Sequence, residues 1–160
     1  MAMSPTTRVM LTGTFVIGFG LGWAANVDRS GVLAQAPSKP FMMQRVYTGT
    51  DGLSHVENIE LNAQSMLQQV VGARVSMSQP GSFSDYHVGP ERRYIINLTG
   101  GGQLQLAEGK VDLPAGSVEY IDDLTGKGHT TANVGREPRL SVWLRFADQK
   151  QIIGPLSKTK

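Results

Sequence analysis

The sequence predicts an all-β domain over residues 41–160, and three features support this prediction. Apolar and polar residues alternate in short runs at the two-residue period of a strand. Turn-forming residues separate the runs, and the chain holds 19 glycines and 8 prolines. Only Asn62–Val71 competes as a short helix. Many short strands joined by frequent turns favour a sandwich or a barrel, and periodicity alone leaves both open.

Four strands are expected in the first half of this domain. They are Phe41–Tyr47, His55–Leu61, Leu67–Met77 and Arg93–Leu98. Residues 48–52 are rich in glycine and residues 79–82 contain a Pro-Gly pair, so both segments are expected to turn the chain.

Five further strands are expected in the second half. They are Gln103–Leu106, Lys110–Leu113, Ser117–Asp123, His129–Val134 and Arg139–Phe146. The Glu108-Gly109 pair is a hairpin signal between the first two. A turn centred on Gly126 is expected to join the strands that end at Asp123 and begin at His129.

Residues 1–27 are expected to form a signal peptide or membrane anchor, and residues 28–40 a linker. Val9–Val27 carries no charged residue and follows Arg8, which is typical of an export signal. The run is also about the 20 residues that span a bilayer. Cleavage could follow Ala36 or lie near Ala25, and a buried core helix is the alternative. This pattern places the domain outside the cytoplasm, either periplasmic or membrane-anchored.

The charge pattern argues against a nucleic-acid partner. The formal net charge is only +2, and the basic residues are scattered rather than gathered in a stripe. The chain has no cysteine, so it forms no disulfide. We therefore expect a small-molecule ligand as the main partner, with membrane contact only through the N-terminal segment.

Two glycine-containing frameworks carry a family resemblance. Gly81, His87 and Gly100 have the spacing of the first cupin motif, and Pro114 and Gly116 that of the second. The run at 122–130, Asp-Asp-Leu-Thr-Gly-Lys-Gly-His-Thr, is similar to a stretch in a group of small single-domain cupins. The resemblance implies a cupin-type jelly-roll β-barrel, and cupins also commonly pair through their outer strands, which implies a homodimer.

The metal site implied by this resemblance is degenerate. Gly89 and Arg93 stand where the first motif has its second histidine and its glutamate, and Glu119 stands at the second motif's histidine position. The remaining candidate ligands for a divalent transition metal are His87, Glu119 and, if its strand faces inward, His129. A guanidinium cannot donate a lone pair and repels a cation, so Arg93 argues against the usual metal geometry. A hydrogen-bonded interior histidine is the simpler interpretation of His87.

His129 and Asp123 form a candidate acid–base pair. A hairpin centred on Gly126 would bring them opposite each other, and the carboxylate would fix the tautomer of the imidazole. The alternative is a cross-strand polar pair that only stabilises the hairpin.

Four residues are candidate ligand-binding residues: Arg93, Tyr94, Glu119 and Trp143. Arg93 either anchors a carboxylate or phosphate with its planar fork, or forms a buried ion pair with Glu119 that replaces the metal. Tyr94 and Trp143 either pack in the core or line the pocket.

Three functions fit these features. The first is an exported barrel that binds a small, anionic ligand. The second is a lyase, isomerase or oxygenase acting on a small carboxylate or a sugar-like molecule, by acid–base or metal chemistry. The third is a structural dimer module. Fold alone does not decide among them.

Overall fold

The computed structural model describes residues 39–62 and 68–156, and their regular structure is almost entirely β. The ten strands are β1 (Met42–Thr48), β2 (Ser54–Glu60), β3 (Val70–Ser78), β4 (Phe83–His87), β5 (Arg93–Asn97), β6 (Gly101–Leu106), β7 (Gly109–Pro114), β8 (Val118–Asp122), β9 (His129–Asn133) and β10 (Arg139–Phe146). The all-β prediction is confirmed. β3 begins at Val70, so the helical alternative is wrong there, while residues 63–67 lie outside the described part.

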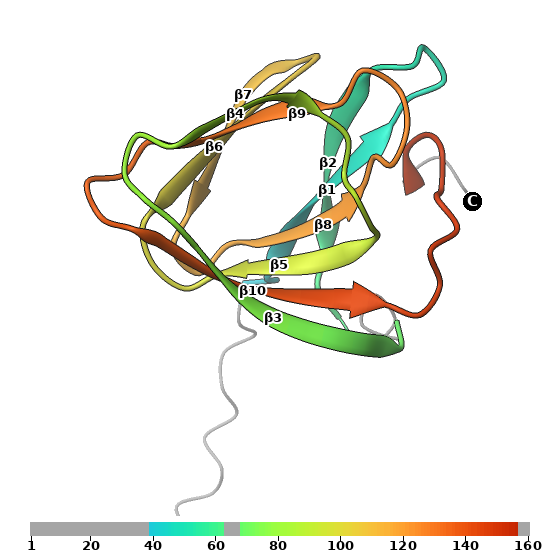
Figure 1. Ribbon diagram of the computed structural model, residues 1–160. Helices are drawn as coiled ribbons and strands as arrows, with labels where there is room; N and C mark the ends of the chain where they lie inside the picture. The colour runs from blue at the N-terminus through green and yellow to red at the C-terminus, as the bar shows by residue number, and fades with distance from the viewer. Residues whose placement is uncertain (1–38, 63–67, 157–160) are drawn as a thin grey trace, which may run out of the picture. The chain divides into compact units, whose positions relative to one another are not determined.

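The strands form two sheets that face each other, as Figure 1 shows. The larger sheet has the order β2-β1-β8-β5-β10-β3, and the smaller has the order β4-β9-β6-β7. β1 pairs with β8 in parallel, and every other strand pair is antiparallel. Two packed, mainly antiparallel sheets with crossings between them are the jelly-roll arrangement.

The main core lies between the sheets. Side chains that alternate along each strand point inward and pack there, as the two-residue period requires. The buried members are Val46, Ile95, Leu104, Leu106, Leu113 and Ile121. Trp143 packs against this group from β10.

A second apolar cluster covers the opposite face of the larger sheet. Its buried members are Met43, Tyr94, Val118, Tyr120 and Phe146. The Tyr94 ring meets Phe146 edge-on at 4.6 Å, and burial raises the pKa of Tyr94 to about 12. Of the two alternatives for Tyr94, the structure shows packing, because its place in β5 turns the ring away from the space between the sheets.

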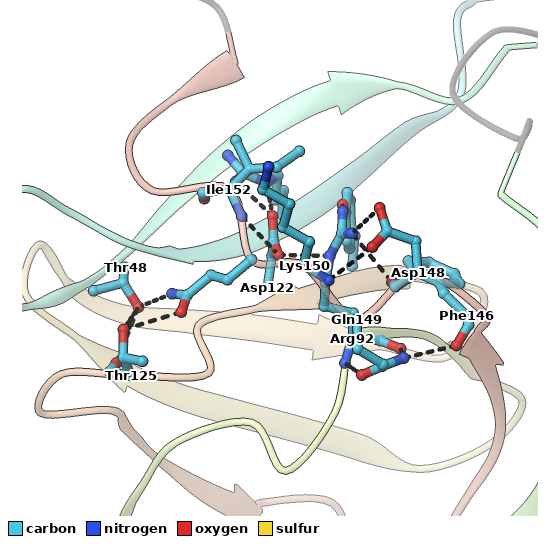
Figure 2. A network of polar contacts seen from close by, with 12 residues as sticks. Thr48, Arg92, Asp122, Thr125, Phe146, Asp148, Gln149, Lys150 and Ile152 are labelled. Atoms are coloured by element: carbon cyan, nitrogen blue, oxygen red, sulfur yellow. Dashed lines mark hydrogen bonds and ion pairs between the residues drawn. The ribbon is translucent and has the colours of Figure 1, made fainter.

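The C-terminal segment is tied to this outer face by a buried ionic network (Figure 2). Asp122 is fully buried and accepts hydrogen bonds from Arg45 Nε at 3.0 Å and Nη2 at 2.6 Å. Its other oxygen lies 2.8 Å from Arg92 Nε. Arg45 also donates to the carbonyls of Ile152 and Gly154. One carboxylate thus holds two buried guanidinium groups, and one of these fastens the chain end.

The connection from β8 to β9 differs from the predicted hairpin. β8 belongs to the larger sheet and β9 to the smaller, so residues 123–128 cross from one sheet to the other. Gly126 and Gly128 both have φ above +70°, which a residue with a side chain rarely adopts. The turn residues were therefore identified correctly, but they join two sheets rather than two paired strands.

β4 was not predicted from the sequence. Four of its five residues are exposed, and the strand contains a register shift against β9 between Ser84 and His87. An exposed edge strand with a bulge lacks the regular alternation by which strands are recognised.

The predicted export segment and most of the predicted linker lie in residues 1–38, outside the described residues. Within 39–62 and 68–156 the chain forms no helix long and apolar enough to cross a membrane.

His55 ties β2 to two neighbouring turns and should make stability depend on pH. Burial lowers the pKa of His55, but hydrogen bonds to Asp51 and Glu108 outweigh it and raise that pKa above its ordinary 6.5. The charged imidazole therefore stabilises the fold fully below about pH 6.5, and the contribution disappears as pH rises through the folded-state pKa.

Unfolding free energies of the natural protein and a His55→Gln variant test this pH dependence. The difference between them should shrink from about pH 6 to about pH 9. A difference that is constant over this range would show that the two carboxylates do not favour the charged imidazole.

Candidate functional site

A small cavity of about 180 Å³ lies between the two sheets. Six strands contribute side chains to its wall, and three groups of residues share it. The polar and charged members are Arg93, Glu119, Arg139, His87 and His129; the hydroxyl members are Ser76, Ser78, Ser84 and Thr131; the remainder are Gly89, Ile95, Ile121 and Trp143. Five of the sequence-predicted site residues thus meet in one cavity, and Asp123 lies directly behind His129.

The bulge in β4 places two polar residues in this cavity. Ser84 pairs with Thr131 and His87 with His129, so three steps along β4 match two along β9. In a regular strand, side chains three residues apart face opposite ways. The extra residue restores the same face, and both Ser84 and His87 line the cavity.

His129 is held by a buried hydrogen-bonded carboxylate. Its Nδ1 lies 2.6 Å from Asp123 Oδ2, and Ser54 Oγ donates to the same oxygen at 2.7 Å. All three residues are at most 4% exposed. Because an ionised carboxylate only accepts, Nδ1 carries the proton and Nε2 of the neutral imidazole is the free acceptor. The predicted contact between His129 and Asp123 therefore exists, and it spans the two sheets.

His87 is oriented in the same way by the backbone. Its Nδ1 lies 2.7 Å from the carbonyl oxygen of Asp85, so Nδ1 donates and Nε2 is left as an acceptor. The two imidazole rings are neighbours, with centroids 4.8 Å apart. The cavity therefore has two histidines whose tautomers are fixed by groups outside it.

Arg93 is a buried cation with unused hydrogen-bonding capacity. It is 5% exposed, and neither Nε nor Nη1 forms a hydrogen bond within the described part of the chain. Its guanidinium stacks 3.8 Å from the Trp143 ring centre and approaches Glu91 only at 3.5 Å. Burial lowers the pKa of Arg93, although the group stays charged at neutral pH. Buried donors of this kind are normally paired, which suggests a missing acceptor.

Glu119 pairs with Arg139, not with Arg93. Its Oε1 accepts from Arg139 Nη2 at 2.5 Å and from Asn97 Nδ2 at 2.8 Å, while Arg139 Nε donates to Asn97 Oδ1 at 2.8 Å. Burial raises the pKa of Glu119, and Arg139 and Asn97 oppose that rise. Of the two alternatives for Arg93, the ion pair with Glu119 is therefore not formed, because Arg139 on β10 occupies the place of the counter-ion.

The predicted metal ligands do not form a site together. Among the described residues, no group of three or more histidine, cysteine or acidic side chains is arranged to hold a metal ion. Nε2 of His87 and of His129 could each donate to a metal. However, Glu119 already accepts from two groups, and Arg93 and Arg139 bring two positive charges to the same wall. The set of His87, Glu119 and His129 thus does not fit a divalent cation.

Gly89, at the second histidine position of the first motif, has no room for a side chain. A Cβ there would lie 2.4 Å from Ile121 Cγ2 and 3.2 Å from Asp123 Oδ1. We therefore expect Gly89→Ala to lower the free energy of unfolding by about 1–3 kcal/mol, measured in urea. Gly72→Ala is the matched control, because its Cβ would meet nothing closer than 3.9 Å. Equal effects of the two changes would contradict this account of Gly89.

Two parts of the site were missed by sequence reasoning. Arg139 and Asn97 had no motif to mark them, although both begin or end a strand with an inward-facing polar residue. The four hydroxyl residues were missed because serine and threonine on strands are common at surfaces. The four hydroxyl residues come together only through the register shift in β4 and the pairing of β3 with β10.

Comparison with known proteins gives a resemblance in fold. No protein-family model matches the chain, and no curated protein does. Solved structures do, among them a cupin domain from Bordetella pertussis Tohama I, at 16% identity over 71% of this chain and 100% of that one, with a TM-score of 0.39. A sugar phosphate isomerase of the cupin superfamily from Silicibacter pomeroyi matches at 18% identity, over 66% and 69%, with a TM-score of 0.40.

A predicted oxalate decarboxylase from Thermotoga maritima matches at 17% identity, over 69% of this chain and 96% of that one, with a TM-score of 0.39. The chain thus resembles cupin proteins, as its motifs predicted. The jelly-roll assignment itself rests on the strand order and register, and the chemistry must be argued from the cavity.

Proposed function

We propose that the protein binds a small carboxylate in the cavity between its sheets, with Arg93 as the anchor. The observation that carries this proposal is the buried guanidinium whose Nε and Nη1 form no hydrogen bond to the described residues, although Nη1 pairs with Glu91 across 3.5 Å. A carboxylate can accept a charge-assisted hydrogen bond from such a donor. Trp143 supports it, because it holds the guanidinium plane from one side.

The charges on the cavity wall are compatible with an anionic ligand. Arg93 and Arg139 contribute two positive charges and Glu119 one negative charge among the lining residues. Two carboxylates outside the lining balance part of this charge, since Glu91 lies 3.5 Å from Arg93 and Asp123 lies behind His129. A cavity of about 180 Å³ suits a small molecule such as a short-chain acid.

An NMR titration of the purified protein with propanoate tests the proposal. We expect saturable shifts of resonances from cavity residues, with a Kd of about 1 mM or tighter, since propanoate has only five heavy atoms. Linear, unsaturated shifts confined to exposed lysines would refute binding in the cavity.

An acid–base enzyme is the second candidate function, and the Asp123–His129 contact favours it. His129 Nε2 could take a proton from carbon beside the carbonyl of a bound 2-oxo acid, while Arg93 balances the carboxylate charge. The electron pair of the broken C–H bond would form the C=C bond of an enolate while the carbonyl π pair moves to oxygen, and return of a proton to carbon would regenerate the 2-oxo acid. Incubation with pyruvate in D₂O tests this: deuterium should enter the methyl group with the natural protein and not with a His129→Gln variant.

We further propose that the N-terminal segment exports or anchors this domain outside the cytoplasm. The support is the uncharged run Val9–Val27 after Arg8. Pairing of two copies through outer strands stays a prediction. Exposed Val75 and Met77 on the edge strand β3 are compatible with it.

A further inference from the structure

Hydroxyl groups line the uncharged side of the cavity. Ser76 and Ser78 come from β3 of the larger sheet, and Ser84 and Thr131 from β4 and β9 of the smaller one. In the part of the chain that the structure describes, none of these four hydroxyls makes a hydrogen bond to another protein group. Glu119 and His129 in the same cavity do have protein partners.

The alternation and pairing of the strands explain why these hydroxyls face the cavity. Ser76 and Ser78 lie two residues apart on the inward face of β3, while Val75 and Met77 between and beside them are exposed. Ser84 and Thr131 are direct partners across β4 and β9. Each sheet therefore supplies two neighbouring hydroxyls to the same small cavity that holds Arg93.

A ligand with a carboxylate alone would not use these groups. If its apolar part lay against the hydroxyls, it would displace water from them and leave them without partners. A site built to hydrogen-bond a hydroxyl discriminates against analogues that lack it. Hydroxyl groups on the ligand can both donate to and accept from serine and threonine.

We infer that the ligand is a small hydroxy acid, with its carboxylate on Arg93 and its hydroxyls on Ser76, Ser78, Ser84 and Thr131. This inference rests on the proposed function, since it assigns the second half of the same ligand. Both sheets contact one molecule in this arrangement, so the ligand bridges the two layers of the barrel.

A series of three acids with the same carbon count tests the inference. Propanoate, 2-hydroxypropanoate and 2,3-dihydroxypropanoate share a three-carbon chain and one carboxylate, and they differ only in hydroxyl groups. In NMR titrations of the full chain, affinity should rise about fivefold with each hydroxyl. The ratio of affinities for the dihydroxy acid and propanoate is the quantity of interest.

Two variants show which residues set that ratio. In a Ser76→Ala, Thr131→Val double variant the ratio should fall toward one. In a Ser82→Ala variant it should stay as in the natural protein, because Ser82 is exposed in the turn before β4 and does not line the cavity.

The outcomes separate the two levels of the proposal. Equal affinities for all three acids in the natural protein would overturn the hydroxy-acid inference and leave carboxylate binding intact. An unchanged ratio in the double variant would overturn the assignment to the hydroxyl wall. No saturable binding of any acid would overturn the proposed function together with this inference.

Discussion

Replacing Arg93 by methionine is expected to abolish most of the carboxylate affinity without unfolding the protein. Arg93 Nε and Nη1 form no hydrogen bond to the described residues, and charge-assisted hydrogen bonds from this guanidinium to the carboxylate would be lost. The loss should amount to about 2–4 kcal/mol, or roughly 30- to 1000-fold in Kd for propanoate. Methionine has a similar length and can still pack on Trp143. Parallel NMR titrations of the natural protein and the variant measure the difference.

The same change should not destabilise the ligand-free protein. A buried guanidinium with unpaired donors costs about 1–3 kcal/mol, so its removal should raise the free energy of unfolding by about 1 kcal/mol. Arg74→Met is the matched control, because Arg74 stacks 4.0 Å from the same Trp143 ring but does not line the cavity. If the Arg93 variant binds propanoate within twofold of the natural affinity, Arg93 is not the residue that anchors the carboxylate.

The second large effect is expected at Asp122, far from ligand chemistry. Asp122→Asn keeps the shape of the side chain but removes the charge that compensates Arg45 and Arg92, whose side chains are 0% and 1% exposed. Breaking a buried ion pair by removing one partner costs about 3–5 kcal/mol. We expect a loss of this size in urea unfolding, together with release of the C-terminal segment at Ile152 (Figure 2).

Asp148→Asn provides the control for that prediction. Asp148 also pairs with Arg92, at 3.2 Å, but its side chain is 66% exposed. A surface pair of this kind contributes about 1 kcal/mol or less. If the Asp122 variant proves too unstable to purify, replacing Arg45, Arg92 and Asp122 together by methionine, methionine and leucine should recover much of the stability. Equal losses in the two single variants would show that burial does not decide the strength of these pairs.

Most of the barrel was predictable because its strands are half-buried. β10, for example, alternates Leu140, Val142 and Leu144 with Ser141, Trp143 and Arg145, and the structure places the first three on the outer face of the larger sheet. Such a pattern identifies a strand before any contact is known. It does not state which strand will be its neighbour, and so the path from Asp123 to His129 was predicted as a hairpin although it crosses between sheets.

The site was only partly predictable, because contacts between distant strands decide it. His87, Arg93, Glu119, His129 and Trp143 were named from sequence and meet in the cavity. The partner of Glu119 was not predictable, since Arg139 reaches it only through the pairing of β10 with β5 and of β5 with β8. Tyr94 was assigned to the ligand although it follows Arg93 directly, and adjacent residues of a strand face opposite ways.

The Nε–Hε resonance of Arg93, followed by heteronuclear NMR while propanoate is added, reports most directly on carboxylate binding in the cavity. We expect a saturable shift of this resonance, accompanied by shifts of the ring protons of His87 and His129, which line the same cavity. An Arg93 resonance that stays unmoved while other resonances saturate would place the anion elsewhere and refute Arg93 as the anchor.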